Sequence, residues 1–151
     1  MAPSPERDEP DSTGELLARA FRSLRHRWMA DSARFGLLPH QVRALRVLSK
    51  GSARPGQVAD RLHITPRSAT EVIDALVTQG LVSRAPDPTD RRATLVSLTD
   101  HGRQISADVL RERRRVSAEW LGRLGEEDRA ELHRLLTLLL EDDADGHGTD
   151  R

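Results

Sequence analysis

The sequence contains no cysteine, and aromatic residues make up only 3% of its 151 residues. The absence of cysteine excludes disulfides, thiolate metal ligands and thiol-based redox sensing within the chain. The sequence has no run of 18 apolar residues and no signal-peptide pattern, so we expect a cytoplasmic protein with no membrane partner. At this length, one domain with a buried core is expected.

Lysine is almost absent, since Lys50 is the single lysine among 24 basic residues, and the formal net charge is zero. The charges are unevenly distributed, because residues 16–140 hold 22 basic and 14 acidic side chains, a net charge of +8. A basic body of this kind fits an electrostatic footprint on DNA. We expect acidic, disordered tails at residues 1–11 and 142–151. The alternative to a DNA-binding body with acidic tails is that the acidic ends only aid solubility.

Motifs for enzyme chemistry are missing from the sequence. We find no glycine-rich phosphate loop, no nucleophile elbow and no acid pair with a supporting base. The six histidines are scattered and none pair at i,i+4, so we expect no metal site, no cofactor and no enzyme activity. Their positions are His26, His40, His63, His101, His133 and His147.

The most informative stretch begins with a predicted helix over residues 66–80. Thr65 can cap it, Pro66 suits its first position, and Gly80 is the usual residue after a helix end. One face is apolar at helical spacing. That face comprises Ala69, Val72, Ile73, Leu76 and Val77.

A predicted β-hairpin follows this helix, with strands at residues 81–85 and 94–98 and a turn-rich tip at 86–90. Two shorter helices, at residues 39–51 and 57–63, precede it. A helix, a short turn, a helix and then a hairpin with arginines at its tip indicate a winged helix-turn-helix.

Three further helices are predicted at residues 12–30, 99–121 and 126–141. The last carries six leucines within nine residues, Leu132 to Leu140. This is too many for one face of a solitary surface helix, so a second chain is expected to cover part of them.

The hairpin resembles that of the MarR family of bacterial transcription regulators. The resemblance rests on Asp90, Arg92, Leu98, Thr99 and Gly102, which follow the family's wing pattern. It implies a mainly α fold with a small β-hairpin wing: a winged helix-turn-helix lobe at residues 38–98 between dimerisation helices at 12–37 and 99–141. It also implies a homodimer that binds double-stranded DNA at a pseudo-palindromic operator, represses transcription and releases DNA when a ligand binds. The alternatives are a winged-helix protein-interaction module without DNA binding and a metal-sensing regulator.

The predicted DNA contacts lie on the exposed helix face and in the wing. Arg67 can pair with guanine or phosphate, Thr70 can touch a thymine methyl, and Glu71 needs a cytosine amine to avoid repulsion. In the wing, Asp90 is expected to orient the guanidinium of Arg92 over the minor groove. The full predicted set is Arg54, Thr65, Arg67, Ser68, Thr70, Glu71, Arg84, Asp90, Arg91 and Arg92.

A ligand site on the first helix is implied by the same resemblance. The family commonly binds small anionic aromatic molecules between the dimer helices and the DNA-binding lobe. An indole for stacking and guanidinium groups for a carboxylate are available there. The candidates are Arg19, Arg22, Arg25, His26 and Trp28. The alternative is that Trp28 belongs to the core and the arginines are solvated or paired with acids.

Overall fold

The computed structural model describes residues 11–146, apart from the side chains of Arg91 and residues 142–146. Most of the two predicted acidic tails, at residues 1–11 and 142–151, therefore lies outside the described residues. The chain divides into two compact units, Met1–Arg114 and Arg115–Arg151, which are described in turn.

The first unit begins with helix α1 (Thr13–Ser32), whose first turn is closed by Ser12. The Ser12 hydroxyl accepts the backbone N–H of Glu15, and the Glu15 carboxylate accepts the N–H of Ser12. This reciprocal capping box satisfies two amide groups that the helix itself leaves unpaired. A short 3-10 helix, η1 (Ala33–Phe35), follows and ends at Gly36 in a left-handed conformation.

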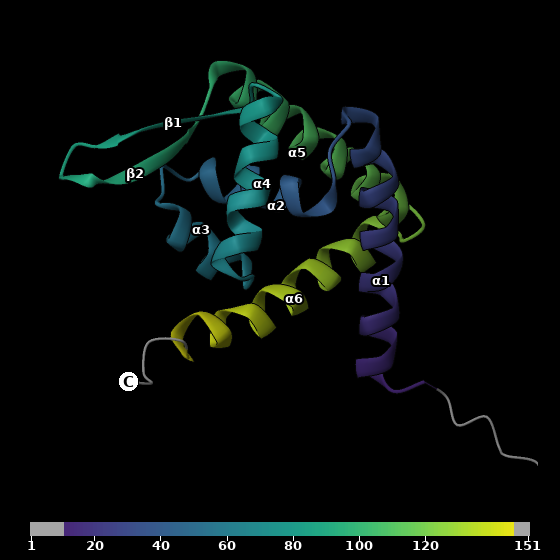
Figure 1. Ribbon diagram of the computed structural model, residues 1–151. Helices are drawn as coiled ribbons and strands as arrows, with labels where there is room; N and C mark the ends of the chain where they lie inside the picture. The colour runs from purple at the N-terminus through teal and green to yellow at the C-terminus, as the bar shows by residue number, and fades with distance from the viewer. Residues whose placement is uncertain (1–10, 147–151) are drawn as a thin grey trace, which may run out of the picture. The chain divides into compact units, whose positions relative to one another are not determined.

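Three helices form the centre of this unit: α2 (Pro39–Leu48), α3 (Pro55–Leu62) and α4 (Pro66–Thr78) (Figure 1). Each starts with proline, which has no N–H to leave unsatisfied at that position. α2 ends three residues before the predicted end, with Ser49 in the C-cap position. α3 is followed by His63, a left-handed residue with φ of 54°. The largest fully buried side chains are Leu45, Val58, Ile73, Leu76 and Val96.

The predicted hairpin is formed by strands β1 (Val82–Asp87) and β2 (Asp90–Leu98), which pair antiparallel and extend away from the helices (Figure 1). Both strands are longer than expected, because pairing continues to Asp87 and Asp90 through the stretch predicted as the tip. The segment before α3 joins them as well, since Ala53 exchanges two backbone hydrogen bonds with Val96. This pairing ties the wing to the helical core.

Helix α5 (Asp100–Leu121) starts directly at the end of β2 and passes from the first unit into the second. Thr99 caps it as predicted, accepting the N–H of Gly102 at 2.9 Å. The same Thr99 hydroxyl donates to the carbonyl of Gly80 at 2.7 Å, and the Thr99 N–H donates to the carbonyl of Leu81. The start of α5 is therefore fastened to the end of α4.

The second unit contains the end of α5 and helix α6 (Glu126–Gly146). α6 continues five residues beyond the predicted end at residue 141, into the segment expected to be a disordered tail. Four leucines of α6 are exposed in the single chain. They are Leu135, Leu138, Leu139 and Leu140, with exposed fractions from 45% to 64%.

Candidate nucleic-acid interface

The N-terminus of α4 is held by the residue predicted to cap it. The Thr65 hydroxyl accepts the backbone N–H of Ser68 at 3.1 Å and donates to the Ser68 hydroxyl at 2.9 Å. Two predicted DNA contacts, Thr65 and Ser68, therefore lie together in the first turn. Their mutual hydrogen bonds fix where that turn begins.

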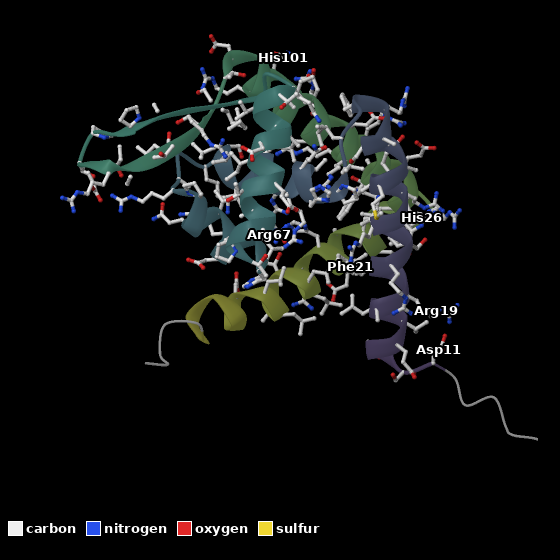
Figure 2. All side chains as sticks on the ribbon, in the orientation of Figure 1. Asp11, Arg19, Phe21, His26, Arg67 and His101 are labelled. Atoms are coloured by element: carbon white, nitrogen blue, oxygen red, sulfur yellow. The ribbon has the colours of Figure 1, made fainter. Side chains whose placement is uncertain are left out.

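The exposed face of α4 carries Arg67, Thr70 and Glu71, as the sequence predicted. The Arg67 side chain is 91% exposed, and its Nε lies 3.4 Å from a carboxylate oxygen of Glu71, one helical turn away. Figure 2 shows Arg67 on α4. The Thr70 hydroxyl donates to the carbonyl of Pro66 at 3.0 Å. Glu71 thus has an attractive partner on its own helix, which sequence reasoning did not give it.

The first wing strand is linked to α4 by an ion pair. Arg84 of β1 donates from a terminal guanidinium nitrogen to Asp74 of α4 at 2.6 Å. Because the Asp74 side chain is about half exposed, this contact adds little to stability. It does hold Arg84, a predicted phosphate contact, beside the exposed face of α4.

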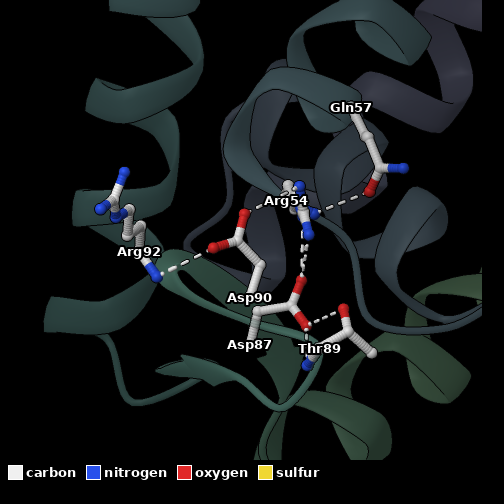
Figure 3. Close-up of polar contacts among 6 residues, drawn as sticks. All are labelled: Arg54, Gln57, Asp87, Thr89, Asp90 and Arg92. Carbon is white, nitrogen blue, oxygen red and sulfur yellow. Dashed lines mark hydrogen bonds and ion pairs between the residues drawn. The ribbon is translucent and has the colours of Figure 1, made fainter.

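The base of the wing is organised around the buried carboxylate of Asp87, which is 5% exposed (Figure 3). One of its oxygens accepts the hydroxyl and the N–H of Thr89 at 2.7 and 2.8 Å. The other accepts Nε and a terminal nitrogen of Arg54 at 2.9 and 2.7 Å. The bonds from Thr89, and then that from Arg54, lower the pKa of Asp87 from 3.8 to about 2.

Arg54 in turn is placed by the start of α3. Its backbone N–H donates to the side chain of Gln57 at 2.9 Å, and its guanidinium lies 3.8 Å from Asp90 (Figure 3). We call this set of Arg54, Asp87, Thr89 and Asp90 the wing clamp. Sequence reasoning assigned Arg54 a phosphate contact and gave Asp87 no role. The role of Asp87 depends on its burial, and burial cannot be predicted from a stretch of turn-forming residues.

The expected link between Asp90 and the guanidinium of Arg92 is wrong. Asp90 accepts the backbone N–H of Arg92 at 3.1 Å, and its other oxygen faces Arg54 (Figure 3). Within the part of the chain that the structure describes, the Arg92 guanidinium joins no ion pair. Asp90 therefore shapes the backbone of the wing, while Arg92 itself is exposed. The side chain of Arg91 lies outside the described residues.

The residues predicted for a ligand are spread along α1 and do not converge. Arg19 is paired with Asp11 near the helix start (Figure 2), and Arg22, Arg25 and His26 are exposed. Trp28 is half-buried, and the guanidinium of Arg113 from α5 lies 5.4 Å from the centre of its ring. Arg113 is a partner that sequence reasoning did not assign.

Two further expectations concern metals and membranes. Among the described side chains, which end at residue 141, no three histidine or acidic groups lie close enough together to hold a metal ion. Across residues 11–146, no helix is both long and apolar enough to cross a membrane.

Comparison with known proteins agrees with this architecture. The model of the MarR family matches residues 35–93. The HTH-type transcriptional repressor MdtR of Bacillus subtilis is 30% identical over 113 residues, which cover 74% of this chain and 73% of MdtR. The uncharacterised HTH-type regulator Mb0904 of Mycobacterium bovis is 40% identical over 82 residues. That match spans about half, 54%, of each chain.

Among solved structures, the YusO protein of Bacillus subtilis superposes with a TM-score of 0.72 at 27% identity, over 87% of this chain and 99% of YusO. The region aligned with MdtR is longer than the winged helix and therefore includes part of the flanking helices. The chain therefore belongs to the MarR family of helix-turn-helix transcription regulators, a family of DNA-binding proteins and not of enzymes.

Proposed function

We propose that this chain is a ligand-responsive repressor that binds a pseudo-palindromic operator as a homodimer. The observation that carries the proposal is the exposed Arg67 on a capped helix, beside a wing held by an ion pair between Arg54 and the buried Asp87. An α-helix of this kind fits the major groove, where a guanidinium can pair with guanine. The name of MdtR, a repressor that aligns over most of this chain, supports the direction of regulation.

The proposed DNA contacts fall into two classes. Arg67, Thr70 and Glu71 lie where they can reach base edges. Arg54, Arg84, Arg91 and Arg92 are proposed to meet phosphates or the minor groove. Thr65, Ser68 and Asp90 position them through the α4 cap and the wing backbone.

Base reading by Arg67 is tested by selecting bound sequences from random duplex DNA. Wild type is expected to enrich a two-fold symmetric sequence, while Arg67→Ala should lose preference at one position in each half-site, because phosphate contacts carry no sequence information. Arg27→Ala, an exposed arginine on α1, is the control and should enrich the wild-type sequence. Absence of enrichment by wild type, or a flat response of affinity to salt, would favour the protein-interaction module.

The proposed homodimer follows from apolar side chains that the single chain leaves exposed. On α1, Leu16, Leu17 and Phe21 are 52%, 48% and 56% exposed. The four leucines of α6 add a second such surface. Exposed apolar patches of this kind commonly mark protein interfaces.

Replacing Leu139 by Asp is expected to give monomers or insoluble protein, because a carboxylate would have to be buried in the interface. Light scattering after size exclusion measures this against the 16.9 kDa chain mass. His133→Asp changes an exposed residue of the same helix and should leave the dimer intact. A folded, monomeric wild type would contradict the dimer.

Release of DNA is proposed to follow from the binding of a ligand at α1. The α1 residues Arg19, Arg22, Arg25, His26 and Trp28 remain its candidates, for a small anionic aromatic molecule. The contact between Arg113 and Trp28 adds a guanidinium at this place.

A further inference from the structure

A groove of about 600 Å³ lies between α2 and α3 in the first unit. Four of its lining side chains are basic, and the proposed function uses none of them. The lining residues are Arg43, Arg46, Val47, Lys50, Arg61 and Leu62. We call this the α2–α3 groove.

The basic side chains of the α2–α3 groove lack acidic partners. Among the described residues, none of the four joins an ion pair, whereas Arg54 and Arg84 are each held by a carboxylate. Arg43 and Arg46 lie three residues apart on α2, and Lys50 follows four residues later, just beyond the end of the helix. Like charges at these spacings repel one another. A bound anion would relieve this repulsion.

Arg46 also repels Arg113, a neighbouring arginine of α5. Burial lowers the pKa of Arg113, and the positive charge of Arg46 lowers it further. Arg46 is therefore close enough to Arg113 for the two positive charges to repel one another.

Part of the groove is fixed in position. The guanidinium of Arg43 donates to the carbonyl of Leu62, the last residue of α3, at 2.5 Å. Leu62 is itself 3% exposed and, with Val47, supplies an apolar part of the wall. A ligand would therefore meet an apolar surface bordered by cations, one of which already joins the two helices.

The groove is separate from the proposed DNA contacts on α4. The buried side of α2, which includes Val42, Leu45 and Leu48, packs in the core shared with α4. Arg43 and Arg46 are exposed and lie on the other side of α2, and Lys50 is exposed just beyond the end of that helix. Core side chains thus lie between the groove and α4.

We propose that the α2–α3 groove binds a small organic polyanion with at least two separated phosphate or carboxylate groups. One group would contact Arg46 of α2 and Lys50 just after it, and the other would contact Arg61 on α3. Guanidinium and ammonium groups bind such anions through charge-assisted hydrogen bonds. This ligand class and this place differ from those proposed for α1, so the inference goes beyond the proposed function.

Calorimetric titration of the full chain without DNA tests the site, with inorganic tripolyphosphate and citrate as probes. Saturable binding of one anion per chain is expected, and the stronger probe tells whether phosphate or carboxylate groups are preferred. The double variant Arg46→Gln/Lys50→Gln should weaken binding about tenfold or more, since two charge-assisted contacts are lost. The matched control is Arg27→Gln/Arg114→Gln, which removes two exposed cations of the same unit and should bind like wild type.

Three results would overturn the proposal: no saturable binding of either probe, an equal loss in both double variants, or a loss of operator affinity confined to the groove variant. The second would mean a general effect of charge, and the third a phosphate contact with DNA. Operator binding by wild type is measured separately, so failure of the groove and failure of the proposed function can be told apart.

Discussion

Replacing Gly102 by alanine is expected to destabilise the fold by about 3 kcal/mol, because it overpacks a site closed by backbone atoms. A Cβ placed on Gly102 would lie 1.9 Å from the carbonyl oxygen of Leu81 and 2.8 Å from its carbonyl carbon. A backbone carbonyl cannot rotate away as a flexible side chain can. To relieve the clash, the start of α5 must move away from Leu81, which strains the hydrogen bonds of Thr99 to Gly80 and Leu81.

Thermal or denaturant unfolding measures this loss, which corresponds to a fall in Tm of about 10 °C for a chain of this size. The control is Gly14→Ala in α1, where an added Cβ meets nothing within 4 Å. It should leave stability unchanged or raise it slightly, because alanine favours helix over glycine. Equal stability of the Gly102→Ala variant and wild type would show that the two segments are less closely packed than described.

Replacing Asp87 by Asn is expected to weaken operator binding about tenfold, by lowering the fraction of molecules whose wing is correctly placed. The change removes the charge that holds Arg54 and leaves that guanidinium without its buried partner. Electrostatics alone predicts the opposite sign, since losing a negative charge should strengthen binding to DNA. A loss of affinity therefore reports the position of the wing.

The control for this effect is Asp108→Asn, which removes a carboxylate paired with Arg111 on α5, away from the wing. It should bind the operator as well as wild type or slightly better. Arg54→Gln breaks the same pair and also removes a proposed phosphate contact, so it should weaken binding at least as much as Asp87→Asn. Tighter binding by Asp87→Asn would show that the wing clamp does not place the wing.

The pH dependence of stability gives the wing clamp a second signature. The folded pKa of Asp87, about 2, lies below its ordinary value of 3.8. Its contribution to stability is therefore complete above pH 3.8 and is lost as the pH falls toward 2. The difference in unfolding free energy between wild type and Asp87→Asn should be constant from pH 5 to 7 and shrink below about pH 4.

Much of the fold could be predicted from local sequence signals. Thr65, Pro66 and Thr99 mark helix starts through chemistry that acts within one turn, and the structure confirms all three positions. The length of the two wing strands was underestimated. The prolines beside Asp87 favour a turn, but Asp87 pairs with Asp90 of the other strand, and a pairing of this kind cannot be predicted from local sequence.

The candidate site was harder to predict where it depends on contacts distant in sequence. Because Asp90 and Arg92 are two residues apart, the sequence suggested an ion pair between them. In the structure the guanidinium near Asp90 is that of Arg54, which comes from the start of α3 and also binds Asp87, 33 positions further along the chain. The pattern of apolar and basic residues correctly predicted helix α1, but it did not predict the contact between Arg113 and Trp28. Spacing along one helix places residues on a face, but it does not identify what packs against that face.

The close approach of Gly102 to Leu81 also bears on how motion passes through the protein. Leu81 follows α4 by three residues, and Gly102 lies in the first turn of α5, so neither can shift alone without a collision. α5 has 22 residues and, at the rise of an α-helix, is about 33 Å long. The first turn of α5 is joined to the end of α4 both by this close approach and by the hydrogen bonds of Thr99. A tilt of the start of α5 would require a matching shift at the end of α4, because a backbone carbonyl at this contact leaves no slack between the two helix ends.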